Sequence, residues 1–191
     1  MHQPLTSSEA VEAKLKNILE ICLDFSAMTR VFAKGSYGQI IAELEICLLR
    51  MADVVDQTEY DGLHNDFCRW FAANIWTAER RTRSGQLRAS LPASYGQAAK
   101  VLDVAAKVYF YYCSQPSPEI ALRLVPLLHA ALDTEMMHRL YPQSPDTLHD
   151  LDSAGYQLLQ SLVVQTIAKA NLLRVQYDDV MWRRLQRVTS T

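Results

Sequence analysis

The segment 92–141 constrains the fold of this 191-residue chain more than any other part of the sequence. Behind Tyr95, apolar residues recur at steps of three and four, which is the period of one face of an α-helix. Other apolar residues occupy the remaining faces of the same stretch, and a helix that is apolar on most sides lies inside a fold. The sequence therefore predicts a central helix over 95–113, in the middle of a helical bundle.

Capping residues and prolines mark the ends of this helix and of its neighbours. Ser94 is the expected N-cap of the central helix, because its hydroxyl can accept an unpaired N–H of the first turn. Ser117, followed by a proline, starts another helix, which Pro126 is expected to kink or end. Asp133 is the expected N-cap of a helix over 134–141.

Helical periodicity also covers the rest of the chain. A capping box of Thr6 and Glu9 opens a first helix that should reach about residue 33. Further helices are expected at about 39–56, 61–83 and 152–175, with a short terminal helix capped by Asp178 or Asp179. No alternating strand pattern appears. The sequence predicts an all-α fold, a single-domain helical bundle of about seven to eight helices over 1–191.

The tetrapeptide SYGQ occurs twice, at 36–39 and at 94–97, each time at the start of an apolar helix. A duplicated helical hairpin would explain the echo. Two independent uses of one favourable turn would explain it equally, and the similarity fades within a few residues, which favours this second interpretation.

Composition and charge narrow the class of protein. Hydrophobic residues make up 49% of the chain, a normal value for a globular protein, and the net charge of −2 gives no overall attraction to nucleic acid or to acidic membranes. No apolar run is long enough to span a bilayer, and no secretory signal pattern opens the chain. The cysteines lie far apart in apolar helical contexts, which predicts reduced core thiols in a cytoplasmic protein: Cys22, Cys47, Cys68 and Cys113.

Arg123 and His129 enclose five residues, and this spacing resembles the Arg-to-His motif of HEPN-type ribonucleases, which are all-helical. The resemblance implies a pair that acts across a dimer interface on an RNA phosphate. An arginine would stabilise the phosphate charge, and a histidine would move protons at neutral pH. The alternative is a solvated Arg123 and a packed or capping His129, and Pro126 interrupts the motif.

His129 and Asp133 lie four residues apart and would share a metal ion if they stood on one continuous helix. A zinc site needs a third protein ligand and supporting hydrogen bonds, and no HExxH or clustered carboxylate pattern supplies them. The sequence therefore predicts no metal and no other cofactor, and Asp133 is interpreted as a helix cap.

Two arginine clusters are candidate phosphate-binding groups: Arg80, Arg81, Arg83 and Arg88, and, near the C-terminus, Arg183, Arg184 and Arg187. Together they could bind a nucleic acid, with Trp76 or Trp182 as a stacking surface. The low net charge favours a simpler interpretation, in which the first cluster neutralises the last turn of a helix and the second is a solvated tail. Whether the clusters meet in space is left open.

Asp103 and Lys107 lie four apart on the central helix and are expected to pair in a buried position. If either faced a cavity instead, that would indicate a small-molecule pocket inside the bundle. The many aromatic residues, from Phe67 to Tyr112, exceed what one small core holds, and the surplus predicts a subunit interface and hence a homo-oligomer.

From Ser94 onward, the chain resembles small bacterial and mobile-element proteins in which a G-x-AQK-like turn opens an apolar helix and an H-x-x-x-D segment follows. Gly96, Gln97 and Lys100 match the first part, with an extra alanine, and His129 and Asp133 match the second. The resemblance implies a bacterial or mobile-element origin and no particular activity.

Together these observations predict a non-enzymatic interaction or regulatory module, homodimeric, with a protein partner as a further possibility and no membrane contact. The alternative is a nucleic-acid-binding protein of the HEPN-like ribonuclease kind. A small-molecule pocket inside the bundle is a third option.

Overall fold

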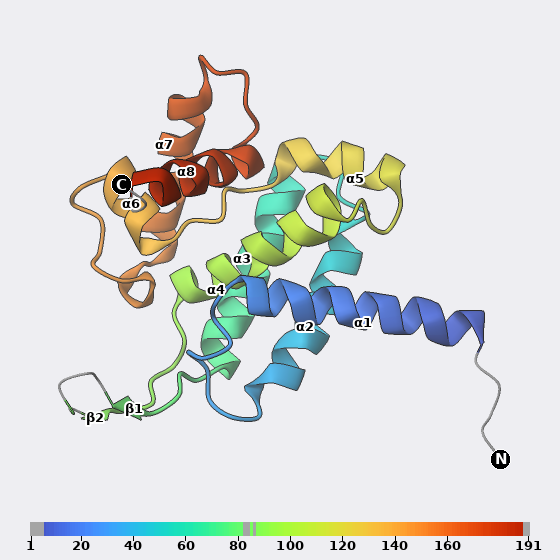
Figure 1. Cartoon of the computed structure of the whole chain (residues 1–191), viewed down its shortest axis with the longest axis horizontal. Coiled ribbons are helices and arrows are strands. Elements are labelled where there is room, and N and C mark those ends of the chain that lie inside the picture. Colours follow the sequence, from blue (N-terminus) through green and yellow to red (C-terminus); the bar gives the residue numbers. More distant parts are fainter. Residues whose placement is uncertain (1–5, 82–84, 86, 189–191) are drawn as a thin grey trace.

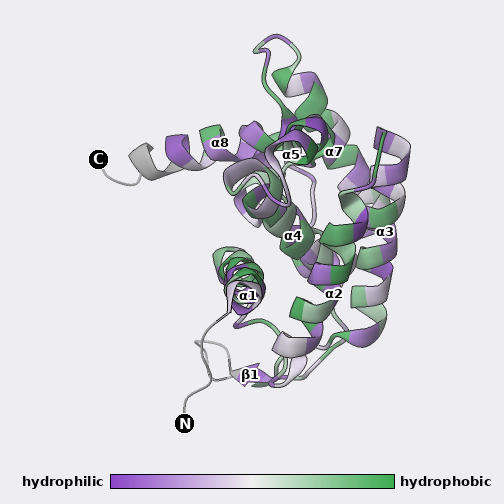
Figure 2. Cartoon of the chain, turned by 90° about the vertical axis from the view of Figure 1, so that its right-hand side faces the viewer, coloured by the Kyte–Doolittle hydropathy of each residue, from purple (hydrophilic) through white to green (hydrophobic). Residues whose placement is uncertain are grey.

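Helix α4 (Tyr95–Ala106) and the π-helix η1 that continues it (Lys107–Tyr112) run through the middle of the molecule (Figure 1). This computed structural model describes residues 6–81, 85 and 87–188 of the chain. Ten of the twelve residues of α4 are buried, and Figure 2 shows hydrophobic positions over most of its length. The predicted central helix is confirmed, and its last six helical residues, Lys107–Tyr112, are π-helical.

The described chain is an all-α bundle, as predicted, with seven further α-helices around α4. These are α1 (Ser7–Phe25), α2 (Ser36–Met51), α3 (Gln57–Asn74), α5 (Pro118–Leu124), α6 (Thr134–Leu140), α7 (Ser153–Ile167) and α8 (Arg174–Val188). Two 3-10 turns, η2 (Val125–Leu127) and η3 (Leu148–Asp150), and an antiparallel pair of two-residue strands, β1 (Arg80–Arg81) and β2 (Leu87–Arg88), complete the elements. None of the helices in the described part of the chain is long and apolar enough to cross a membrane.

Close packing around α4 follows from its alanines, which let other helices approach its backbone. Helices α1, α2, α3 and α7 and the 3-10 turn η3 all contact α4. In one such approach, the Cys22 thiol of α1 lies 3.7 Å from the carbonyl oxygen of Ala105. The buried side chains form one continuous core that includes residues of all eight α-helices.

Four predicted helix starts are confirmed by their caps, whereas α2 and α3 begin at Ser36 and Gln57, before the predicted residues 39 and 61. Thr6 and Glu9, and likewise Ser94 and Gln97, form reciprocal capping boxes at α1 and α4. The side chain of Ser117 accepts from Ile120 N–H at α5, and Asp133 accepts from Met136 N–H at α6. Pro126 lies in η2, where the chain leaves α5, as its missing backbone donor requires.

Several predicted helix ends are wrong. Helix α1 ends at Phe25 and not near residue 33, because Ala27 adopts a left-handed conformation with φ of 57°. Helix α3 ends at Asn74, and the chain then runs extended through Ile75 to the β1–β2 hairpin. The arginines at 80 and 81 therefore belong to a strand and do not lie in the last turn of a helix.

At the C-terminal end, the predicted helix over 152–175 is two helices. Helix α7 ends at Ile167, and α8 already begins at Arg174. Asp178 and Asp179 therefore lie inside α8 and are not its caps. Their carboxylates instead accept hydrogen bonds from a lysine of η1, described below.

The two SYGQ segments have different structural roles. Ser94 is the N-cap of α4, whereas Ser36 is the first residue of α2 and follows Gly35, whose φ is 94°. Gly96 lies against the 147–151 loop, and its N–H donates to Leu151 O at 3.0 Å. These differences agree with two independent uses of one turn.

Gly96→Ala is expected to lower the free energy of unfolding by about 1–3 kcal/mol, the usual cost of overpacking. A methyl group there would lie 2.5 Å from the carbonyl oxygen of Leu148 and 2.7 Å from Cβ of Leu151. Gly38→Ala in the other SYGQ copy is the matched control, because a methyl group meets nothing within 4 Å. Urea denaturation of both variants checks this, and equal effects of the two would contradict the packing described.

Candidate functional site

A polar stripe runs along the otherwise apolar helix α4 and into η1. Lys100, Asp103 and Lys107 follow one another at steps of three and four residues, so they share one side of the helix. Asp103 and Lys107 are both buried, as the sequence predicts. They do not pair with each other. Each binds groups from other elements, and these partners define two neighbouring polar sites.

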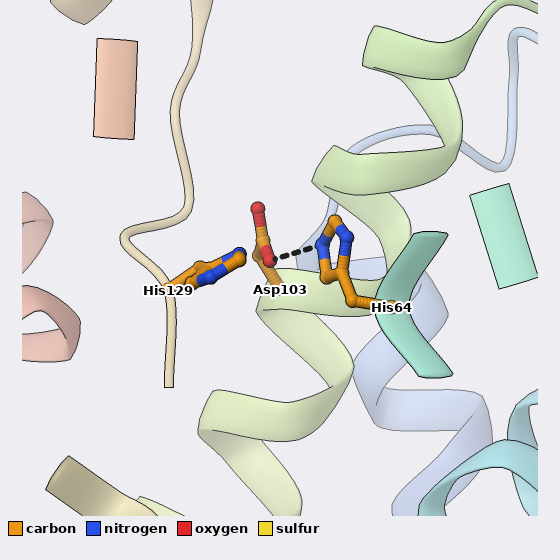
Figure 3. Close-up of side chains that lie close together, drawn as sticks. All are labelled: His64, Asp103 and His129. Atoms are coloured by element: carbon orange, nitrogen blue, oxygen red, sulfur yellow. Dashed lines mark hydrogen bonds and ion pairs between the residues drawn. The ribbon is translucent and has the colours of Figure 1, made fainter. Parts of the chain in front are cut away.

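The first site is a buried network around Asp103, shown in Figure 3. Oδ1 of Asp103 lies 3.0 Å from Nε2 of His64 on α3, and Oδ2 accepts a 2.8 Å hydrogen bond from the hydroxyl of Tyr156 on α7. The side chains of His64 and Asp103 are fully buried. The imidazole of His64 also stacks on the Tyr156 ring, with 5.1 Å between ring centroids.

His129 extends this network towards the surface. It lies in the extended segment between η2 and α6, with Nδ1 at 2.9 Å from the Tyr156 hydroxyl. Its Nε2 lies 2.9 Å from Oδ1 of Asp61, a carboxylate that also accepts from Gln57 and is 39% exposed. The network thus joins α3, α4, α7 and the 128–133 segment through hydrogen bonds.

Burial lowers the pKa of both imidazoles, but their partners differ. It opposes the charged form of His64, but the Cys68 sulfur and the Asp103 carboxylate outweigh this effect and raise the pKa of His64 to about 10. Burial lowers the pKa of His129 despite its hydrogen bond to Asp61. His64 is therefore charged at neutral pH and paired with Asp103, whereas His129 is neutral.

His64, Asp103 and His129 also offer the donor set of a divalent metal site, with ligand atoms within 4.8 Å of one another. Zinc binds such nitrogen and oxygen ligands at about 2.0–2.2 Å. The Tyr156 hydroxyl lies 2.8–3.2 Å from an atom of each of the three, in the space between them. A metal ion would have to displace this hydroxyl or take it as a fourth ligand. In this structure the hydroxyl belongs to the hydrogen-bonded network, and the absence of a metal stays a prediction.

The second site surrounds Lys107, at the start of η1. Its ammonium donates to Oδ2 of Asp178 at 2.6 Å and to Oδ1 of Asp179 at 2.5 Å, and the Tyr112 hydroxyl donates to the same Asp179 oxygen. The lysine side chain is 4% exposed. These bonds fix α8 against the π-helical turn, and π-helical turns are frequent at functional sites.

A cavity of about 270 Å³ opens beside this ion pair, and we refer to it as the α4–α8 cavity. Its apolar wall contains Phe25, Ala27, Val104, Ala131, Met136 and Trp182. Its charged wall contains Lys100, Lys107, Asp133, Asp178 and Asp179. Lys107 is buried and lines this cavity. A buried lysine that faces a cavity is the expected sign of a small-molecule pocket inside the bundle.

Two polar groups of the α4–α8 cavity have no partner within the described part of the chain. Lys100 forms no hydrogen bond or ion pair there, and burial lowers its pKa although Asp133 and Asp178 act in the opposite direction. Oδ1 of Asp178 is buried and accepts no hydrogen bond. Burial raises the pKa of Asp178 to about 6, so this carboxyl group is mainly ionised at pH 7.

Arg123 and His129 bind different parts of the structure and have separate structural roles. The Arg123 guanidinium donates to the carbonyl oxygens of Ala52 and Val54, just beyond the end of α2. His129 is buried in the network described above, as a packed histidine. The two residues do not share a helix, because η2 intervenes. Their catalytic role stays a prediction.

The two arginine clusters lie apart. Figures 1 and 2 both place the β1–β2 hairpin, which carries Arg80, Arg81 and Arg88, at one end of the molecule and α8 towards the other. Arg183 and Arg184 are exposed on α8, which also contains Arg187, while Arg83 lies outside the described residues. Arg80 and Arg88 line a surface groove together with Asp146 and Asp150. Phosphate binding by these clusters stays a prediction.

The surplus aromatic residues are partly exposed. Trp76, Tyr112 and Trp182 are each about half exposed, whereas Phe67 and Phe71 are core residues. The homodimer predicted from this surplus stays a prediction.

All four cysteines are free, and burial raises the pKa values of Cys22 and Cys47 to about 12, so these two thiols are inert at neutral pH.

Sequence reasoning missed His64, Tyr156 and Asp178 as site residues. The signal that was present is the polar stripe on the most apolar helix, since a charged group on a buried face needs partners.

No family model matches the chain, nor does any curated protein or solved structure.

Proposed function

We propose that this protein is a non-enzymatic regulatory module that binds a metabolite-sized ligand in the α4–α8 cavity. The observation that carries the proposal is the pair of unpartnered polar groups, one cationic and one anionic, in a cavity that also has an apolar wall. Binding sites for small molecules have this composition, an apolar lining with a few placed polar groups.

The chemistry of the lining residues supports binding over catalysis. The described residues of the cavity wall include no histidine, cysteine or serine, and its carboxylates are engaged by Lys107 or by the start of α6. The two histidines near α4, His64 and His129, are buried and held by their own partners.

The position of the cavity supports a regulatory role. Its walls come from α1, α4, η1, the 128–133 segment, α6 and α8, so one ligand would contact the central helix and the C-terminal helix together. A ligand that binds only when α8 is docked would stabilise that arrangement by its binding free energy. Ligand binding would then be transmitted to other molecules by a change in the docking of α8.

A ligand at 100 times its dissociation constant is expected to stabilise the protein by about 2.7 kcal/mol. For a chain of this length that raises the melting temperature by about 5–10 °C. The measurement is a thermal shift assay with amino acids, carboxylic acids, amines, sugar phosphates and nucleosides, followed by mass spectrometry of the bound compound. The compound is expected to be recovered unchanged.

Val104→Phe places a ring in the cavity and is expected to abolish the shift. Val164→Phe is the matched control, because Val164 is exposed on α7 and outside the cavity, and it should keep the shift. The proposal fails if no compound class raises the melting temperature of the wild type, or if Val104→Phe binds as well as Val164→Phe.

A further inference from the structure

The two unpartnered groups of the α4–α8 cavity specify the chemistry of its occupant, so this inference rests on the proposed function. The side chain of Lys100 lines the cavity and has no acceptor among the described residues, so it calls for an anionic group on the ligand. A buried carboxylate oxygen without a donor, Oδ1 of Asp178, calls for an N–H or O–H donor. Leaving the buried oxygen of Asp178 unpaired costs free energy, and a ligand that donates to it recovers that cost.

The other charged groups of the cavity are already engaged. Lys107 is bound by Oδ2 of Asp178 and by Asp179, and the Asp133 side chain accepts the N–H of Met136 at the start of α6. Two lysines and three aspartates give the cavity a formal charge of −1 when all are ionised. A ligand of zero net charge with separated charges therefore fits better than an anion.

We infer that the α4–α8 cavity binds a small apolar α-amino acid, with the ligand carboxylate on Lys100, its ammonium group on Oδ1 of Asp178, and its side chain against the apolar wall. Val104, Met136 and Trp182 supply apolar surface for that side chain. Charge-assisted hydrogen bonds at both ends fix the orientation of the ligand.

Size and charge disfavour other ligand classes. The cavity volume of about 270 Å³ lies below the range of about 300–1,000 Å³ typical of sites for drug-sized ligands, so the occupant is small. A dicarboxylate or phosphate ester would bring two negative charges to a site that already has net charge −1. A simple amine would leave Lys100 without an acceptor.

The test is isothermal titration calorimetry on the whole chain at pH 7.5. The probes are L-leucine, L-methionine and L-phenylalanine, each compared with the acid that lacks its amino group and the amine that lacks its carboxylate. At least one amino acid is expected to bind 10-fold or more tightly than both of its analogues, because each analogue leaves either Lys100 or Oδ1 of Asp178 unpaired. This comparison uses the wild-type protein and needs no variant to fold.

Two substitutions locate the binding. Lys100→Met keeps the length of the side chain without its charge, and Asp178→Asn keeps its shape. Each is expected to weaken binding about 10- to 100-fold. Lys169→Met is the matched control, because Lys169 is exposed after α7, and it should bind like the wild type.

The outcomes separate this inference from the proposed function. If a deaminated acid binds as tightly as its amino acid, or if Lys100→Met binds like the wild type, the amino-acid inference is wrong while a ligand cavity remains. If no amino acid binds but another compound class raises the melting temperature, only the inference fails. If nothing binds, both fail.

Discussion

Asp103→Ala is expected to lower the free energy of unfolding by about 3–5 kcal/mol, the usual cost of removing one partner of a buried ion pair. Asp103 is the carboxylate that pairs with His64, and both side chains are fully buried. Its removal leaves a charged imidazole in the core and takes away the acceptor of the Tyr156 hydroxyl.

Urea denaturation followed by circular dichroism measures this loss. Asp152→Ala is the matched control, because Asp152 caps α7 by accepting from Gly155 N–H at an exposed position, and loss of such a cap costs about 1 kcal/mol. An Asp103→Ala loss no larger than that of Asp152→Ala would show that the buried pair is not ionic.

The double variant His64→Leu with Asp103→Leu removes both charges. It therefore measures the attraction between His64 and Asp103 together with the free-energy cost of burying them. Replacing both partners of a buried ion pair by apolar residues is often neutral or stabilising. The double variant is therefore expected to recover most of the stability that Asp103→Ala loses. A loss equal to the sum of the two single variants would mean that His64 and Asp103 act independently.

The sequence predicted the fold class and several of the helix starts because both depend on local information. A serine or aspartate at an N-cap acts on a backbone N–H three residues away, as at Ser94 and Asp133. The helix ends depend on tertiary packing. Nothing local stops α1 at Phe25 or leads the chain beyond Asn74 into an extended segment that pairs with Phe32 and Pro92.

The candidate site was less predictable for the same physical reason. The polar stripe on α4 is visible in the sequence, but the partners of its members lie far along the chain. Asp103 binds residues 39 and 53 positions away, and Lys107 binds residues 71 and 72 positions away. Local spacing therefore suggested an Asp103–Lys107 pair, whereas the fold offers each of them better-placed partners.

The stability of the protein is expected to fall as pH rises between about 6.5 and about 10, because of His64. Its pKa is 6.5 in an unfolded chain and about 10 in the folded protein. The folded state thus binds this proton more tightly, so the stabilisation is fully present below pH 6.5 and is lost as pH rises through about 10. Between these values the expected slope is about 1.4 kcal/mol per pH unit.

The groups that face His64 decide the pH window for the measurement. They are Cys68 on α3, Asp103 on α4, Tyr156 on α7 and His129 in the 128–133 segment. His129 has a lowered pKa when folded, so it changes stability only at or below about pH 6.5. Raised thiol pKa values add a further loss at higher pH, which the His64 variant shares. A window of pH 7–9 therefore isolates His64.

Urea denaturation at pH 7, 8 and 9 for the wild type and His64→Gln measures the effect. The free energy of unfolding of the wild type minus that of His64→Gln is expected to fall by about 1.4 kcal/mol per pH unit. His149→Gln, outside the network, should keep the pH profile of the wild type. A difference that stays constant from pH 7 to pH 9 would mean that His64 is neutral in the folded protein. The buried network would then be held by neutral hydrogen bonds, and the large loss expected for Asp103→Ala would shrink with it.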